Sequence, residues 1–232
     1  MIIRTSAPTR IDLAGGTIDI WPLYLFHPGA QTINAAISLR ASAQIESRSD
    51  SRITLRSLDT NATVEADDWR ELWHVRELRL LSLLVHFFEV RGFTLTTNSD
   101  SPAGAGIAGS SALNVAVCAA LAEWKRTHYE PEALLQIAMN VEAQTIAVPT
   151  ALQDYRPALY GGIAAIELEA DGVRRVPLDV DLGALQQRIV LCYTGEPRNS
   201  GTNNWEITKR HIDGDQFIFD CFERIRDTAA TM

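Results

Sequence analysis

The residues with the clearest potential for chemistry lie in a glycine-rich loop that precedes an alanine-rich helical pattern. Gly104, Gly106 and Gly109 allow the backbone to adopt positive φ angles and to come close to a ligand. The start of the following helix offers unpaired N–H groups and partial positive charge, which suit a phosphate, and Ser110 or Ser111 can cap it. The loop lacks the lysine of a Walker motif, and no parallel βαβ unit surrounds its G-x-G-x-x-G spacing. It therefore predicts a phosphate site, with an ordinary capped connector as the alternative.

Composition narrows the functional classes. The chain has 232 residues, of which 46% are hydrophobic, and a net charge of -8 that argues against nucleic-acid binding. It contains no apolar run of the ~20 residues that a membrane helix needs. The first residues lack a signal-peptide layout, and the three cysteines (118, 192 and 221) have no metal-ligand spacing. These features predict a cytoplasmic protein with no membrane or nucleic-acid partner; they leave the oligomeric state open.

Strand and helix patterns come in groups along the chain. We expect strands at 2–6, 33–38, 42–48, 52–58, 93–97, 163–169 and 189–194. We expect helices at 75–91, 110–126, 131–144, 202–212 and 215–230, and a loop over 8–28. This grouping predicts an α+β fold in which helices cover one face of a mainly antiparallel sheet.

The glycine-rich loop resembles the second motif of the GHMP kinases, the family of galactokinase, homoserine kinase, mevalonate kinase and phosphomevalonate kinase. The motif stands here as Pro102-Ala-Gly104-Ala-Gly106-Ile-Ala-Gly109-Ser110-Ser111-Ala112. Ile107 takes the place of the usual leucine, and Ala108 that of a glycine.

Three further segments carry the same resemblance in the same order. Residues 7–19 resemble the first motif of the family's sugar-kinase branch, with Gly-Gly-Thr-Ile-Asp in place of Gly-Gly-Gly-Thr-Asp. Residues 151–162 resemble the segment with the catalytic aspartate, and Tyr193 to Ser200 resemble a stretch of the heptose-kinase branch. Four motifs in order make chance similarity a poor explanation.

The resemblance implies a fold and a domain division. It implies an N-terminal ATP-binding domain over residues 1–180 and the beginning of a C-terminal α+β domain over 181–232. The family's third glycine-rich motif is not found after residue 162. We therefore expect a C-terminally truncated chain, either a fragment of a longer product or a short relative.

The implied function is transfer of the γ-phosphoryl group of Mg-ATP to a hydroxyl of a sugar or sugar phosphate, with ATP and Mg²⁺ as cofactors. A non-catalytic nucleotide-binding, metabolite-binding or regulatory protein on the same scaffold is the alternative. A third possibility keeps the kinase and changes the acceptor to an amino acid or an isoprenoid acid. By resemblance, the phosphate-binding residues are Pro102, Gly104, Gly106, Gly109, Ser110, Ser111 and Ala112, and the metal ligands are Ser111 and Glu142.

The resemblance also assigns the reacting end of the site. Asp154 becomes the base that orients the acceptor hydroxyl, with a turn aspartate as the alternative. Arg10 becomes the cation that holds Asp154 ionised and neutralises the γ-phosphate, with a surface arginine as the alternative. For Glu142 the alternative is an exposed helix glutamate, but its position twelve residues before Asp154 favours the metal role.

Small polar residues in the first motif are the expected sugar contacts, because carboxylates and hydroxyls accept and donate to ring hydroxyls. This set comprises Asp12, Gly15, Gly16, Thr17 and Asp19. Asp19 is the stronger candidate, since Asp12 can also serve as a turn cap. Trp21 fits either a sugar face or the core. Arg198 is a candidate for a substrate phosphate, with a solvated loop arginine as an equal alternative.

Overall fold

A seven-stranded mixed sheet forms the centre of the protein. The computed structural model describes residues 1–192 and 200–232. The strands are β1 (Ile2–Ala14), β2 (Gln31–Ser47), β3 (Ile53–Ser57), β4 (Ala62–Ala66), β5 (Phe93–Ser99), β6 (Ile163–Glu169) and β7 (Gly172–Pro177). Their order is β4-β3-β5-β2-β6-β7, and β1 pairs with β2. Only β3 and β5 run parallel among the paired strands of the described chain. The expected mainly antiparallel α+β fold is confirmed.

Two long strands carry the site. β1 continues through residues 8–14, where a loop was expected, and β2 is one strand of 17 residues where two were expected. In their antiparallel register Arg10 lies opposite Ala36, and Asp12 lies opposite Asn34. Because side chains alternate along a strand, Arg10 and Asp12 point to the same face. Irregularities in the register flank both residues.

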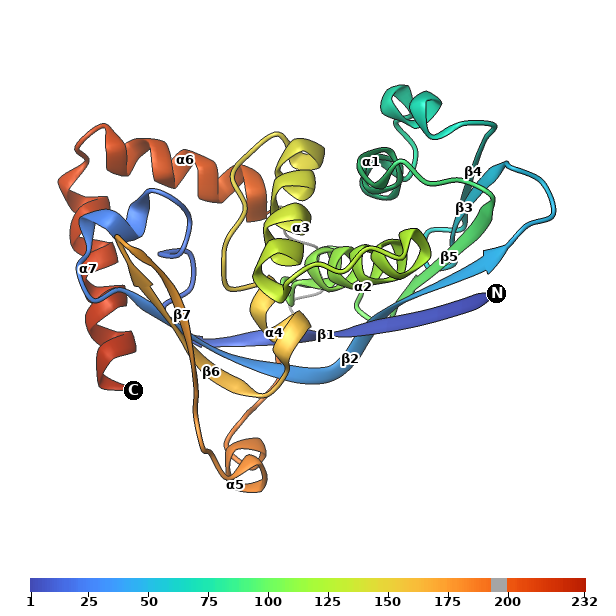
Figure 1. Cartoon of the computed structure of the whole chain (residues 1–232). Helices are drawn as coiled ribbons and strands as arrows, with labels where there is room; N and C mark the ends of the chain where they lie inside the picture. The colour runs from blue at the N-terminus through green and yellow to red at the C-terminus, as the bar shows by residue number, and fades with distance from the viewer. Residues whose placement is uncertain (193–199) are drawn as a thin grey trace.

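Helices cover one face of the sheet, as predicted (Figure 1). The long helices on this face are α1 (Arg79–Phe88), α2 (Gly109–Lys125) and α3 (Pro131–Ile146), followed by the short α4 (Tyr155–Tyr160). The buried side chains between them and the sheet include Phe88 and Phe93. This main core holds the start of α2 against β1 and β2.

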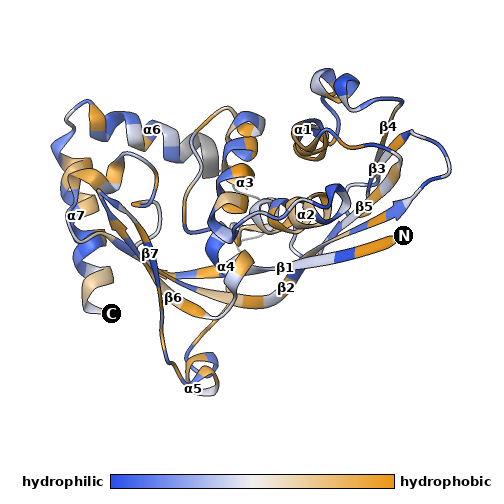
Figure 2. Ribbon diagram, in the orientation of Figure 1, coloured by the Kyte–Doolittle hydropathy of each residue, from blue (hydrophilic) through white to orange (hydrophobic). Residues whose placement is uncertain are grey.

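The last two helices pack on a second, smaller core. Helices α6 (Ser200–Ile212) and α7 (Gln216–Thr231) stand beside the turn η1 (Leu23–Phe26) (Figure 1). Ile218 and Phe222 of α7 are buried together with Ile18. Figure 2 shows hydrophobic and hydrophilic residues in alternation along α7, as a helix with one buried side requires. The domain boundary at 180/181 stays a prediction.

Several short elements lacked a sequence signal. They are η2 (Trp69–His74), α5 (Leu182–Gln186), β4, β7 and α4. The strand expected over 189–194 is wrong for residues 189–192, which form no strand. Each missed element has six residues or fewer, so its pattern spans too few positions to show a period.

Candidate active site

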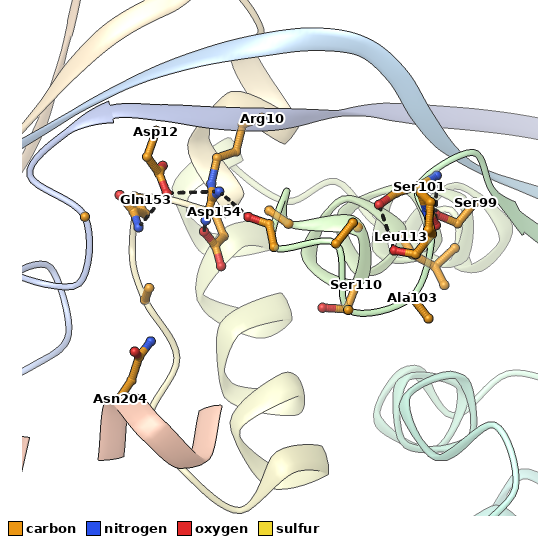
Figure 3. Close-up of a pocket in the computed structure, with 18 of the residues that line it drawn as sticks. Arg10, Asp12, Ser99, Ser101, Ala103, Ser110, Leu113, Gln153, Asp154 and Asn204 are labelled. Carbon is orange, nitrogen blue, oxygen red and sulfur yellow. Dashed lines mark hydrogen bonds and ion pairs between the residues drawn. The ribbon is translucent and has the colours of Figure 1, made fainter. Parts of the chain in front are cut away.

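A cavity of about 380 Å³ lies where the end of β1, the glycine loop and the segment before α4 meet. Figure 3 shows Arg10, Asp12, Gln153 and Asp154 at one end of the cavity, which we call the acceptor end. The glycine loop lies beside them, and Asn204 faces them from α6. Among the predicted residues, those that line it are Arg10, Asp12, Gly16, Thr17, Pro102, Gly104, Gly106, Gly109, Ser110 and Asp154. The fold thus brings together residues that are up to 144 positions apart.

Arg10 is the central cation of this cavity. Its side chain is only 8% exposed, so the alternative of a surface arginine is wrong. Its Nε donates to Asp154 Oδ1 over 3.1 Å, and its Nη2 contacts the same oxygen. Its Nη1 donates to the Gly106 carbonyl over 3.0 Å and lies 3.0 Å from Asp12 Oδ2. Burial works to lower the Arg10 pKa, but the nearby carboxylates of Asp154 and Asp12 raise it above its ordinary value.

Asp154 presents its carboxylate to the cavity instead of capping a helix. It precedes α4, but its side chain accepts no capping hydrogen bond from that helix. Both contacts from Arg10 fall on Oδ1. Within the described residues no hydrogen bond reaches Oδ2, which leaves this oxygen available to a ligand hydroxyl. The geometry therefore favours a reacting carboxylate over a turn aspartate.

A buried amide network supports Asp12. Asn34 Nδ2 donates to Asp12 Oδ1 over 2.8 Å and to Gln153 Oε1 over 3.2 Å, and Gln153 Nε2 donates to Asp12 Oδ2 over 3.4 Å. Asn34 and Gln153 are both buried. Asp12 therefore lies in a strand and anchors Arg10, so the alternative of a turn cap is wrong. Asn34 had no predicted role.

Asp19 is fully buried directly behind this network. The backbone N–H of Gln153 donates to its Oδ2 over 2.6 Å, while its Oδ1 has no partner among the described atoms. Burial, followed by the charge of Asp154, raises the Asp19 pKa to about 7. A buried carboxylate oxygen without a donor is costly. Asp19 does not line the cavity, so its predicted contact with a sugar has no support; its carboxylate instead holds the backbone of Gln153, which does line the cavity.

The glycine loop ends at a bare helix N-terminus. Ala108, with a φ of 60°, is the N-cap residue of α2, and no side chain caps the helix. The expected cap by Ser110 or Ser111 is therefore wrong. The N–H groups of the first turn have no carbonyl one turn earlier within the helix and can face an anion. Ala112 is an exception to the predicted phosphate set, since its N–H donates to the Ala108 carbonyl over 3.0 Å.

The hydroxyl beside Glu142 belongs to Ser110, where Ser111 was expected. Ser110 Oγ donates to Glu142 Oε1 over 2.7 Å and lines the cavity. Ser111 is buried and does not line it. The helix phase explains the difference, because adjacent residues lie ~100° apart around a helix.

Glu142 is a buried acceptor, so the alternative of an exposed helix glutamate is wrong. Its Oε2 accepts from Tyr155 Oη over 2.7 Å and from Asn114 Nδ2 over 3.4 Å. Burial raises its pKa, and a divalent cation would favour the ionised form. No group of three or more His, Cys, Asp or Glu in the described chain has an arrangement that could hold a metal ion. A two-oxygen site of Ser110 and Glu142 fits Mg²⁺, which usually takes few protein ligands and keeps several waters.

The two serines give a direct test of this assignment. We expect Ser110→Ala to raise the Mg²⁺ concentration for half-maximal nucleotide binding by ~10-fold or more, the scale of losing a partner at a metal site. Ser111→Ala makes the same chemical change one residue away and is expected to leave this concentration within ~2-fold. Titration of Mg²⁺ against a fluorescent ATP analogue measures both. A larger effect at Ser111 would restore the original assignment.

Gly15 and Gly16 differ in whether the structure has room for a side chain at their positions. Gly15 has a φ of +78°, and a Cβ there would lie 2.0 Å from the Gln31 carbonyl oxygen. A Cβ on Gly16 would make ordinary contacts of 3.7 Å with Asp12 and 3.8 Å with Gln153. Gly15 is therefore required by the fold, while Gly16 keeps space open at the acceptor end of the cavity.

Alanine substitutions separate these two roles. We expect Gly15→Ala to destabilise the protein by roughly 2–5 kcal/mol, from positive-φ strain and the clash with β2. Gly16→Ala is expected to change stability by less than ~1 kcal/mol and to weaken acceptor binding by narrowing the cavity. Thermal unfolding and acceptor titration measure the pair. Equal losses of stability would contradict the distinction.

The remaining candidates for substrate contact are Thr17, Trp21 and Arg198. Thr17 lines the cavity with a φ of 77°. Trp21 is 64% exposed and does not line the cavity, so its core alternative is wrong and its sugar-stacking alternative has no support. Arg198 lies outside the described residues.

The sequence reasoning missed several cavity residues. Asp59, Ser99 and Ser101 lie on or after the strands that border the glycine loop, and Asn204 comes from α6. Asp59 accepts from Ser57 Oγ over 2.6 Å. Only the strand order places these residues at the cavity, so no local pattern could have indicated them.

A family model and several known proteins resemble this chain in sequence. The family model of the GHMP kinases N terminal domain matches residues 74–162. The chain is 30% identical to D-glycero-alpha-D-manno-heptose 7-phosphate kinase from Campylobacter jejuni, covering 99% of this chain and 70% of that protein. It is 26% identical to galactokinase from Thermotoga maritima, covering 68% of this chain but 44% of the relative.

A solved structure is similar as well. The crystal structure of a D-glycero-D-manno-heptose 1-phosphate kinase from Bacteroides thetaiotaomicron aligns with a TM-score of 0.71 at 27% identity. The alignment covers 80% of this chain and 62% of that one. None of the helices in the described ranges combines the length and the apolar character that a membrane span requires.

Proposed function

The chain belongs to the GHMP kinase family, and on this premise we propose that it transfers the γ-phosphoryl group of Mg-ATP to a hydroxyl of a sugar or sugar phosphate. The observation that carries the proposal is Arg10, which contacts both the predicted base Asp154 and the carbonyl of Gly106 in the phosphate loop. A single guanidinium thus connects the acceptor end of the cavity with its phosphate end.

The donor end fits a nucleotide phosphate chain. Gly104 and Gly106 have positive φ angles of 75° and leave the loop backbone accessible. The first N–H groups of α2 supply donors and a positive dipole without a basic surface, which suits a chain of net charge -8. Bound Mg-ATP would supply the transferable phosphoryl group and a divalent charge, with Ser110 and Glu142 as its protein ligands.

The acceptor end fits a polyhydroxyl substrate. Asp154 Oδ2 would accept the hydrogen bond of the reacting hydroxyl and orient its oxygen toward the phosphate loop. A loose phosphoryl-transfer transition state needs orientation and charge neutralisation more than a strong base. Arg10 pairs with Asp154 and places positive charge next to Gly106, where negative charge would develop. Asp12, which lines the cavity, offers a further acceptor for ring hydroxyls.

The names of the relatives support a sugar as the acceptor. The most similar relatives given above are kinases of heptose phosphates and of galactose. Among the residues of this chain, the carboxylates of Asp12 and Asp154 both line the cavity and fit an acceptor with several hydroxyls better than an acceptor with a carboxylate, which they would repel.

An acceptor panel tests the proposal. The purified chain would be incubated with Mg-ATP and heptose phosphates, free heptose, galactose, fucose, homoserine or mevalonate, and product would be followed by mass spectrometry. We expect transfer to a sugar or sugar phosphate. Transfer to homoserine or mevalonate alone would change the acceptor class. Nucleotide binding without any transfer would favour a non-catalytic role for this chain.

A further inference from the structure

A second hollow adjoins the acceptor end of the cavity. It has a volume of about 520 Å³ and lies between Gly15, Gly16 and one face of α7. The α7 residues that line it are Cys221, Arg224, Ile225 and Thr228, whose spacing of three, four and seven positions places them on one side of a helix. Gly16 lines both hollows, so the two hollows meet at a residue without a side chain.

Helix α7 is held firmly enough to present this face. Ile218, Phe222 and Ala229 are buried on its other side. Gln31 Nε2 donates to the Ala229 carbonyl over 2.8 Å and ties the end of the helix to β2. The hollow is therefore bordered by a packed helix and by the backbone that Gly15 brings against β2.

Arg224 brings an unneutralised cation to this hollow. Its side chain is exposed, and its Nη2 donates to Cys221 Sγ over 3.2 Å. The adjacent acidic residues Glu223 and Asp227 both pair with Arg226. No ion pair of the described chain involves Arg224. The Thr228 hydroxyl donates to the Arg224 carbonyl over 2.7 Å, so the guanidinium is the chief donor on this side of the hollow.

We propose that Arg224 binds a phosphate monoester carried by the sugar substrate at the end remote from the reacting hydroxyl. This inference rests on the proposed function and narrows its acceptor from sugars in general to sugar phosphates. A guanidinium suits the role because its planar fork can bind two phosphate oxygens at once. The carboxylates of Asp12 and Asp154 line the first hollow and would repel a second anion there, so the substrate's own phosphate belongs beside Arg224 in the second hollow.

The test compares matched pairs of acceptors. The probes are D-glycero-D-manno-heptose 7-phosphate with free heptose, and mannose 6-phosphate with mannose. In the full chain we expect Arg224→Gln to raise KM for the phosphorylated member of the preferred pair by about 10- to 100-fold, the scale of a lost hydrogen bond to a charged group. We expect kcat and the KM for the free sugar to change by less than ~2-fold. Arg224→Lys keeps the charge without the fork and should give an intermediate KM.

A control and a binding measurement make the outcomes distinct. Arg226→Gln removes the same charge from the same helix outside both hollows and should leave the preference for the phosphorylated sugar unchanged. If free and phosphorylated sugars react equally well, or if Arg224→Gln affects both equally, the Arg224 proposal is overturned while the kinase stands. If nothing is transferred, calorimetry measures the binding of the four probes to the parent protein and to the Arg224→Gln variant. Binding of a phosphorylated sugar that Arg224→Gln weakens supports the site without the kinase, and binding of none of the four probes overturns it.

Discussion

Asp154→Asn is expected to lower kcat for phosphoryl transfer by roughly 10²- to 10⁴-fold, the range attributed to a positioned acid–base group. The amide is nearly isosteric but carries no charge. It therefore loses the charge-assisted contacts with Arg10 and the anionic oxygen Oδ2 that would receive the substrate hydroxyl. The expected KM for ATP changes little, because Asp154 lies at the acceptor end of the cavity.

Steady-state kinetics with the preferred acceptor measures this effect. Asp171→Asn, in the exposed turn between β6 and β7, makes the same chemical change away from the cavity and should retain full activity. A thermal unfolding curve for each variant shows whether the loss of the Arg10 contacts has unfolded the protein. A folded Asp154→Asn variant with activity within ~3-fold of the parent would refute the assigned role.

Asp19→Asn is expected to stabilise the protein at alkaline pH while it weakens acceptor binding. The pKa of Asp19 is about 7 in the folded protein and 3.8 for the unperturbed group. Since the folded-state pKa is raised, stability is highest below pH 3.8 and falls as the pH rises toward 7. An uncharged asparagine avoids this loss. The gain above pH 7 is about 2–4 kcal/mol, because one pKa unit corresponds to ~1.4 kcal/mol.

Urea unfolding of both proteins at intervals between pH 4 and pH 8 tests this expectation. The difference in free energy of unfolding should grow from pH 4 to pH 7 and then level off. The groups that face Asp19 are Asp154, Asp12, Arg10 and Tyr24; they are common to both proteins, so their direct titration largely cancels in the difference. A difference that does not vary with pH would show that Asp19 is already ionised at pH 4.

The same substitution should weaken the binding of acceptor. Asp19 does not line the cavity, but its Oδ2 accepts from the backbone N–H of Gln153, and Gln153 and Asp154 both line the cavity. Replacing this charge-assisted hydrogen bond by a neutral one loosens the backbone next to Asp154 and should raise KM by roughly 5- to 10-fold. In the parent protein, acceptor affinity should improve as the pH rises through 7. The two expected effects have opposite signs, so a variant that is merely misfolded could not produce both.

The candidate site residues could be predicted from the sequence because each lies in a short segment that resembles a motif of the family. Arg10 and Asp19 belong to the first motif, Gly104 to Gly109 form the loop, and Asp154 precedes a helix. The loop glycines have the positive φ angles or the close packing that their positions suggested. What these residues contact required the fold, since the contact between Arg10 and Asp154 joins β1 to a segment 144 positions later.

The errors came from features that a local pattern does not determine. The choice between Ser110 and Ser111 depends on the helix phase, which the left-handed Ala108 sets. The continuation of β1 through Arg10 and Asp12 depends on pairing with β2, which overrides the loop-like composition of residues 8–14. Asn204 and Arg224 reach the two hollows only through the packing of α6 and α7, so nothing in their own segments indicated a role.

A crystal structure of the chain with Mg²⁺, a non-hydrolysable ATP analogue and the preferred acceptor would test the proposed site as a whole. We expect the β- and γ-phosphates against residues 104–110, the metal at Ser110 and Glu142, and the acceptor hydroxyl within hydrogen-bond distance of Asp154. We also expect Arg10 between that hydroxyl and the phosphate loop. A nucleotide bound elsewhere, or an acceptor whose hydroxyls all lie away from Asp154, would contradict the proposed site.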